Sequence, residues 1–147
     1  MTETFDRLSI IVTGTCLSAA GLLLAGCDAS QAGVVERITP QDRGRYLVER
    51  VGMCADCHSP RGPGGVFDQD RWLHGAPLGF AATVPMPAWA DYAPALAGLN
   101  NYTDEQAIAL LTEGKTIHGQ PLRPPMPPYR FNREDAEAVV AYLRSLK

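Results

Sequence analysis

The chain has 147 residues, of which 46% are hydrophobic and 20% charged, and its formal net charge is -3. This composition predicts one ordinary globular domain with short appendages, and it argues against a disordered chain. The small negative charge and the lack of a lysine- or arginine-rich run exclude a typical nucleic-acid-binding protein.

Residues 1–26 have the pattern of an export signal. The stretch 8–26 carries no charge and ends in small residues, as a signal peptide does. The sequence LAGC that ends at Cys27 resembles the bacterial lipobox, so Cys27 is the expected lipid anchor and 27–38 the expected linker. This predicts a protein anchored on the periplasmic side of the inner membrane. An uncleaved transmembrane helix remains an alternative, because the uncharged stretch approaches the ~20 residues that span a bilayer.

The first helix of the domain is predicted to begin at Thr39. Threonine is a good N-cap, and Pro40 behind it suits the first helical position. The helix is expected to run through 41–52 and to lead into the next motif.

Cys54, Cys57 and His58 form a C-x-x-C-H motif. Two thiols on one helical turn can each bond a vinyl group of the same porphyrin, and the imidazole that follows can bind the iron. A structural zinc site needs four ligands, and only His74 and His118 remain to complete one. A redox dithiol needs an alternating strand and helix pattern that the neighbouring sequence lacks. The motif therefore favours one covalently attached haem c with His58 as an iron ligand.

Two further elements follow the motif. The segment 59–101 is rich in glycine and proline and is predicted to be a long loop, which a haem could support by supplying apolar surface. A helix is then predicted over 103–114, because Thr103 and Gln106 form a capping box and Gly114 is a typical C-terminal residue.

The second iron ligand is predicted to be Met126. Two prolines precede it and two follow it, so the loop is stiff and presents the thioether with little entropy left to lose. Met86 is expected to be packing, Met53 lies within the attachment turn, and the two remaining histidines are expected to be loop residues. Any lone methionine can also be core filler.

The last helix is predicted over 132–147. Asn132 is the expected N-cap, with acidic residues in the first turn and basic residues in the last. Its apolar residues recur at a spacing of three and four and form one stripe. These are Ala136, Val139, Val140, Leu143 and Leu146.

This order of helix, C-x-x-C-H, long loop, helix, methionine loop and terminal helix resembles class I cytochrome c over residues 39–147. The resemblance implies an all-α fold of about three main helices and long loops around one haem. It also implies a crossing of the first and last helices through a glycine and an aromatic residue. Gly44 with Tyr46 and Tyr142 are the candidates here.

The same resemblance implies further contacts of the haem. A proline carbonyl should hold the free N–H of His58, with Pro77 in GAPLG as first candidate and Pro60 as second. Buried aromatic side chains often hold the propionates in this family. The candidates are Trp72, Trp89 and Tyr92, each of which can also be plain packing.

A six-coordinate iron predicts a one-electron carrier rather than an enzyme. The Met126 loop resembles monohaem cytochromes that serve periplasmic alcohol or aldehyde dehydrogenases, which implies redox protein partners leading towards the respiratory chain. Arg61, Arg123 and Arg130 are candidates for a positive docking rim, or for solvated and paired arginines. The alternatives are a haem enzyme or gas sensor with an open iron, and a mainly structural haem in a larger complex.

Overall fold

The computed structural model describes residues 37–147. The predicted signal peptide, the anchor Cys27 and the linker up to residue 36 lie outside the described residues. Among the helices of residues 37–147, none combines the length and the apolar composition that crossing a bilayer requires.

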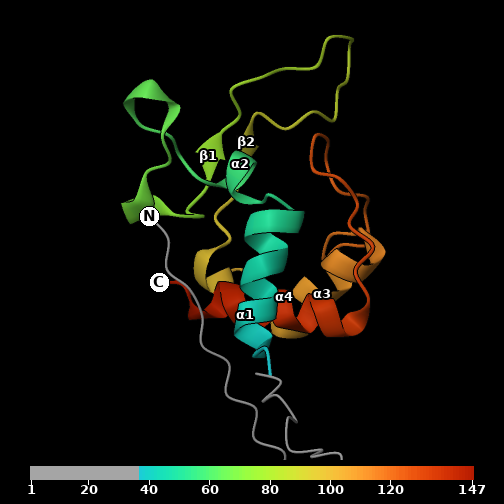
Figure 1. Ribbon diagram of the computed structural model, residues 1–147. Coiled ribbons are helices and arrows are strands. Elements are labelled where there is room, and N and C mark those ends of the chain that lie inside the picture. The colour runs from blue at the N-terminus through green and yellow to red at the C-terminus, as the bar shows by residue number, and fades with distance from the viewer. Residues whose placement is uncertain (1–36) are drawn as a thin grey trace, which may run out of the picture. The chain divides into compact units, whose positions relative to one another are not determined.

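The first helix begins as predicted. The hydroxyl of Thr39 accepts a hydrogen bond from the backbone N–H of Asp42, and α1 runs over Pro40–Tyr46. The helix continues as a π-helical segment over Leu47–Val51 and leads to the short helix α2, Ala55–His58. Figure 1 shows α1 leading directly towards α2. The attachment motif therefore follows this helical segment after a short break at Gly52 and Met53, where Met53 has a φ of 48°.

The helix α3 spans Asp104–Glu113 and has the predicted ends. Thr103 and Gln106 form both hydrogen bonds of the capping box, at 3.2 and 2.9 Å. Gly114 follows with a φ of 67°, a left-handed conformation that favours glycine.

The helix α4 spans Arg133–Ser145, and Asn132 is its N-cap. Four of the five predicted stripe residues are buried, and Leu146 is partly buried against the core. The helix packs against both α1 and α3 (Figure 1). Together these helices supply most of the hydrophobic core and confirm the predicted all-α class.

The crossing of α1 and α4 depends on Gly44. A Cβ atom at this position would lie 1.9 Å from the backbone oxygen of Ala138 and 2.8 Å from the Cβ of Tyr142. The expected pairing of Gly44 with Tyr142 is thus confirmed. The parallel expectation for Tyr46 is wrong, since its side chain is 53% exposed on the outer side of α1, beside the guanidinium of Arg43.

The segment 59–101 is mostly loop, with short regular pieces. It contains three 3-10 turns, over Pro63–Gly65, Gln69–Arg71 and Ala97–Leu99. Two short strands, β1 (Ala76–Pro77) and β2 (Tyr92–Ala93), pair antiparallel. Two-residue strands are too short to leave an alternating pattern in the sequence. In Figure 1 the chain between them extends well beyond the strand pair.

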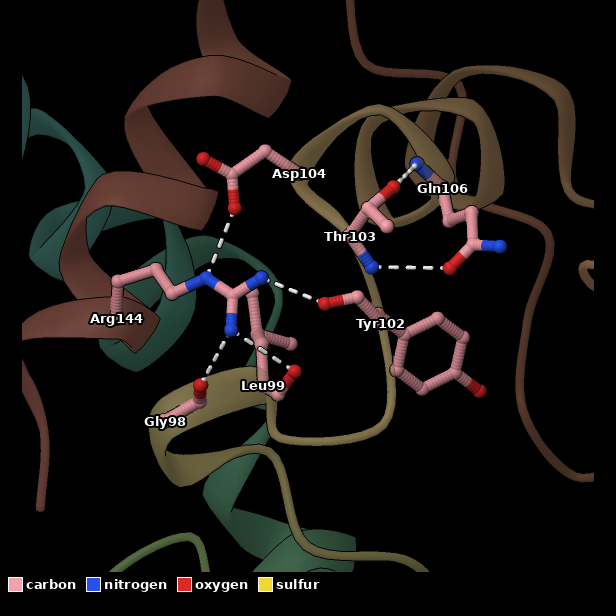
Figure 2. A network of polar contacts seen from close by, with 7 residues as sticks. All are labelled: Gly98, Leu99, Tyr102, Thr103, Asp104, Gln106 and Arg144. Atoms are coloured by element: carbon pink, nitrogen blue, oxygen red, sulfur yellow. Dashed lines mark hydrogen bonds and ion pairs between the residues drawn. The ribbon is translucent and has the colours of Figure 1, made fainter.

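Arg144 near the end of α4 holds the chain that precedes α3 (Figure 2). Its Nε bonds Asp104 at 2.8 Å, and its two terminal nitrogens donate to three backbone carbonyls. These belong to Gly98, Leu99 and Tyr102, at 2.7, 3.0 and 2.6 Å. Since Leu99 and Tyr102 also line the cavity described below, this network fixes one wall of the site.

Candidate functional site

The two cysteines of the attachment motif lie on one turn and form no disulfide with each other. The backbone N–H of His58 donates to the carbonyl of Cys54 at 2.9 Å, which closes the turn. Burial raises the pKa of the Cys54 thiol to about 11. In this environment the thiol is protonated at neutral pH, and both sulfurs line the same cavity.

His58 is buried, with 6% of its surface exposed, and its ring is held in one orientation. The Nδ1 atom lies 2.7 Å from the carbonyl oxygen of Pro94. A carbonyl only accepts hydrogen bonds, so Nδ1 carries the proton and Nε2 keeps its lone pair. Burial lowers the pKa of His58, and the bond to Pro94 opposes this in part. The ring is therefore a neutral imidazole prepared to bind a metal through Nε2.

The expectation that Pro77 or Pro60 holds His58 is wrong. Pro77 lies in β1, where it pairs with Tyr92, and the chain continues from β2 directly to Pro94. The residue before β1 contacts His58 through its backbone instead, since the N–H of Gly75 donates to the carbonyl of His58 at 2.8 Å. The pairing of β1 with β2 thus brings Pro94, rather than Pro77, to the imidazole of His58.

A cavity of about 620 Å³ opens beside the attachment turn. This volume lies within the roughly 300–1,000 Å³ that cofactor pockets occupy. Its walls are mainly apolar and come from the attachment turn, the later part of the long loop, α3, the methionine loop and α4. They include Leu96, Leu99, Leu110, Leu111, Val139 and Leu143. An apolar cavity with two thiols and a neutral imidazole on one wall is suited to the faces of a haem.

Met126 is brought to this cavity, whereas Met86 is not among its lining residues. The side chain of Met86 is 40% exposed on the long loop. Met53 also borders the cavity, but it is 58% exposed and directly precedes Cys54. Among the described methionines, Met126 is the partly buried one at the cavity, and its role as iron ligand stays a prediction.

Tyr129 connects the methionine loop (residues 123–129) to Gly52, just before the attachment motif, a contact that was not predicted from the sequence. Its hydroxyl donates to the carbonyl of Gly52 at 2.6 Å, and its ring stacks on Phe131 at 5.3 Å. Burial, with a smaller effect of the two nearby cysteines, raises the pKa of Tyr129 to about 12. The hydroxyl therefore remains a donor. An aromatic residue directly after the proline run was the available signal.

The three aromatic candidates for propionate contacts differ in position. Trp72 is partly buried, packs edge-on against Phe67 at 5.4 Å and lies against the core. Tyr92 borders the cavity. Within residues 37–147, the Nε1 of Trp89 is buried without a hydrogen-bond partner, one residue before the cavity residue Ala90. A buried donor without a hydrogen-bond partner costs free energy. An acidic group bound near Trp89 would accept a hydrogen bond from its Nε1 and remove this cost.

The three candidate docking arginines are in different environments. Arg61 pairs with Asp56 at 3.1 Å and lies over the ring of Phe67, so its charge is offset. Arg123 donates to two backbone carbonyls of the long loop. Arg130 is exposed beside the methionine loop. The positive docking rim stays a prediction. Of the three arginines, exposed Arg130 supports it best.

The remaining histidines lie away from the cavity walls. His74 and His118 are both exposed, and Nδ1 of His74 lies 2.9 Å from the carbonyl of Trp72. Within the described part of the chain, no three histidine, cysteine or acidic side chains are grouped as a metal site. A zinc site would need four such ligands.

Comparisons with known proteins agree with this geometry. The family model described as cytochrome c matches residues 41–147. A fructose dehydrogenase cytochrome subunit from Gluconobacter japonicus is 30% identical over 115 residues, which are 71% of this chain and 22% of that protein. A diheme cytochrome c-type protein from Cereibacter sphaeroides is 54% identical over 37 residues, 25% of this chain and 12% of that protein. The chain thus spans less than a quarter of the length of either relative.

Proposed function

This chain belongs to the cytochrome c family, and we propose that it is an electron carrier that holds a single covalently bound haem c, attached through Cys54 and Cys57. His58 and Met126, which both line the cavity, would hold the iron. The haem supplies a one-electron couple at the iron. The protein residues would attach it, exclude water from its faces and orient the side chains that hold the iron.

The observation that carries this proposal is the composition of the cavity wall. Both thiols, the imidazole and one thioether border the same apolar space of about 620 Å³. The imidazole is neutral and oriented by Pro94, so it needs no rearrangement to bind iron. Methionine and histidine ligands together raise the haem potential, which suits an acceptor of electrons from a dehydrogenase.

The proposal predicts the behaviour of the purified holoprotein. We expect one haem per chain, a redox titration with a one-electron slope, and no rapid binding of carbon monoxide to the reduced form. The measurements are a haem assay against protein concentration, potentiometry and an absorbance spectrum under carbon monoxide. Rapid carbon monoxide binding by the wild-type protein would instead indicate an open iron, as in a haem enzyme or gas sensor.

The electron donor in this proposal is a periplasmic dehydrogenase, and the acceptor is another cytochrome or an oxidase. The support for a dehydrogenase is the printed description of one relative, a cytochrome subunit of fructose dehydrogenase. Exposed Arg130 beside the methionine loop would assist docking of an acidic partner. Copurification from detergent-solubilised membranes, followed by identification of the accompanying enzyme, tests the assignment of the donor.

Anchoring through Cys27 is the proposed basis for localisation at the periplasmic side of the inner membrane. If Cys27 is lipidated, the mature protein should lack residues 1–26 and partition into detergent. Replacing Cys27 with serine should leave an unprocessed precursor, because serine offers no thiol for the lipid. Mass spectrometry of the membrane-bound protein measures the N-terminus, and an intact residue 1 on the wild type would indicate an uncleaved transmembrane segment instead.

A further inference from the structure

Arg123 binds two consecutive carbonyls of a segment far away in the sequence. Its Nε donates to the carbonyl of Ala88 at 3.1 Å and its Nη2 donates to the carbonyl of Trp89 at 2.7 Å. The planar guanidinium presents several N–H groups in a fixed arrangement, which suits two acceptors held side by side. A lysine ammonium has the same charge but no such rigid arrangement.

A backbone hydrogen bond continues the same contact. The N–H of Ala90 donates to the carbonyl of Pro124 at 2.7 Å. Three hydrogen bonds therefore join residues 88–90 to residues 123–124. The N–H of Met126 in turn donates to the carbonyl of Arg123 at 3.1 Å, so the position of Met126 follows that of Arg123.

The methionine loop has few other means of attachment. Residues 124, 125, 127 and 128 are prolines, which lack a backbone N–H, so Met126 has the one backbone donor between 124 and 128. That donor is used within the loop itself, in the bond to Arg123. Besides the carbonyl of Pro124, which accepts the bond from Ala90, two side chains of the loop donate to the rest of the domain. Tyr129 does so three residues after Met126, and Arg123 does so three residues before it.

We propose that Arg123 is a positioning residue that holds Met126 at the cavity by clamping the methionine loop to residues 88–89. This role rests on the proposed function, in which Met126 binds the iron. It differs from the docking role expected from the sequence, because the guanidinium acts through two carbonyls within its own chain. It also differs from a general electrostatic role, which a lysine at the same position would retain.

The experiment uses purified oxidised holoprotein and cyanide, which can bind the iron only while Met126 is detached. We expect Arg123→Lys and Arg123→Ala both to accelerate cyanide binding about tenfold, the change that loss of one or two hydrogen bonds makes in an equilibrium constant. The absorbance band of thioether-to-iron ligation should weaken in parallel. Arg133→Ala is the matched control, since Arg133 is an exposed arginine whose ion pair with Glu137, at 2.7 Å, lies within α4.

The outcomes separate the clamp from the proposed function. A wild-type spectrum without the thioether band overturns the assignment of Met126 and the clamp with it. If Arg123→Lys shows a normal thioether band and binds cyanide at the wild-type rate, the clamp is overturned while the assignment of Met126 stands. Faster cyanide binding in Arg123→Ala alone would then assign the effect of Arg123 to its charge. Far-UV circular dichroism of each variant establishes that the helices are intact, and Arg123→Lys preserves charge and most of the side-chain volume if Arg123→Ala fails to fold.

Discussion

Met126→Ala should remove the thioether ligation band from the oxidised spectrum and open the iron to cyanide and carbon monoxide. An alanine methyl group has no lone pair with which to bind a metal, so the iron would lose one ligand and gain an open position. The reduction potential should fall by on the order of 0.1 V, a fraction of the roughly 0.8 V over which axial ligands set haem potentials. We expect the effect to be larger than that of any change at Arg123, which only loosens the same ligand.

Met86→Ala is the matched control for this experiment. It removes the same thioether from the 40% exposed Met86, which is not among the residues that line the cavity. Spectrum, potential and ligand binding should therefore remain close to those of the wild type. If Met86→Ala instead abolished thioether ligation while Met126→Ala did not, the long loop would supply the ligand, and the assignment of the distal wall would have to be reversed.

The helices could be predicted from sequence because their signals are local. Thr39, Thr103 and Asn132 each cap a helix through a hydrogen bond to a residue three positions later. The stripe of α4 follows from its own periodicity. None of these signals depends on how distant segments meet. The π-helical continuation of α1 over Leu47–Val51 left no comparable signal.

The proline that holds His58 could not be found in the same way. Pro94 lies 36 residues after His58 and reaches it because β1 pairs with β2. Two-residue strands carry too little pattern to predict that pairing. The sequence offered several prolines in the same loop, and the resemblance to a family pointed to Pro77. The contact is tertiary, and it required the three-dimensional structure.

The binding partners of the charged residue Arg123 could not be predicted from the sequence either. From the sequence it is one of three arginines near the expected haem, and a positive rim is a reasonable inference. The structure gives it two carbonyl acceptors from residues 88 and 89, which are 35 and 34 positions earlier in the chain. Residue type and spacing predict that a charge lies near a site, but they do not predict which partner it meets.

Gly44→Ala should destabilise the domain, although alanine is the better helix former. The gain in helix propensity is about 1 kcal/mol. Against it, the new Cβ would lie 1.9 Å from the backbone oxygen of Ala138, which cannot rotate away as a side chain can. Adding atoms to a packed contact typically costs about 1–3 kcal/mol of folding free energy. A clash with the backbone should cost about 3 kcal/mol or more, because the backbone cannot rotate away. We therefore expect a net loss of roughly 2 kcal/mol and a fall in melting temperature of about 10 °C.

The loss should be measured as the free energy of unfolding in guanidinium titrations of the holoprotein, followed by far-UV circular dichroism. Gly79→Ala is the matched control, because a Cβ at Gly79 would have no neighbouring atom within 4 Å. Since Val139 and Leu143 of α4 line the cavity, separation of α1 from α4 should also loosen the cavity wall and raise the cyanide binding rate. A Gly44→Ala protein as stable as the wild type would mean that the two helices can move apart at little cost, and the close crossing would then not be what holds α4 against the site.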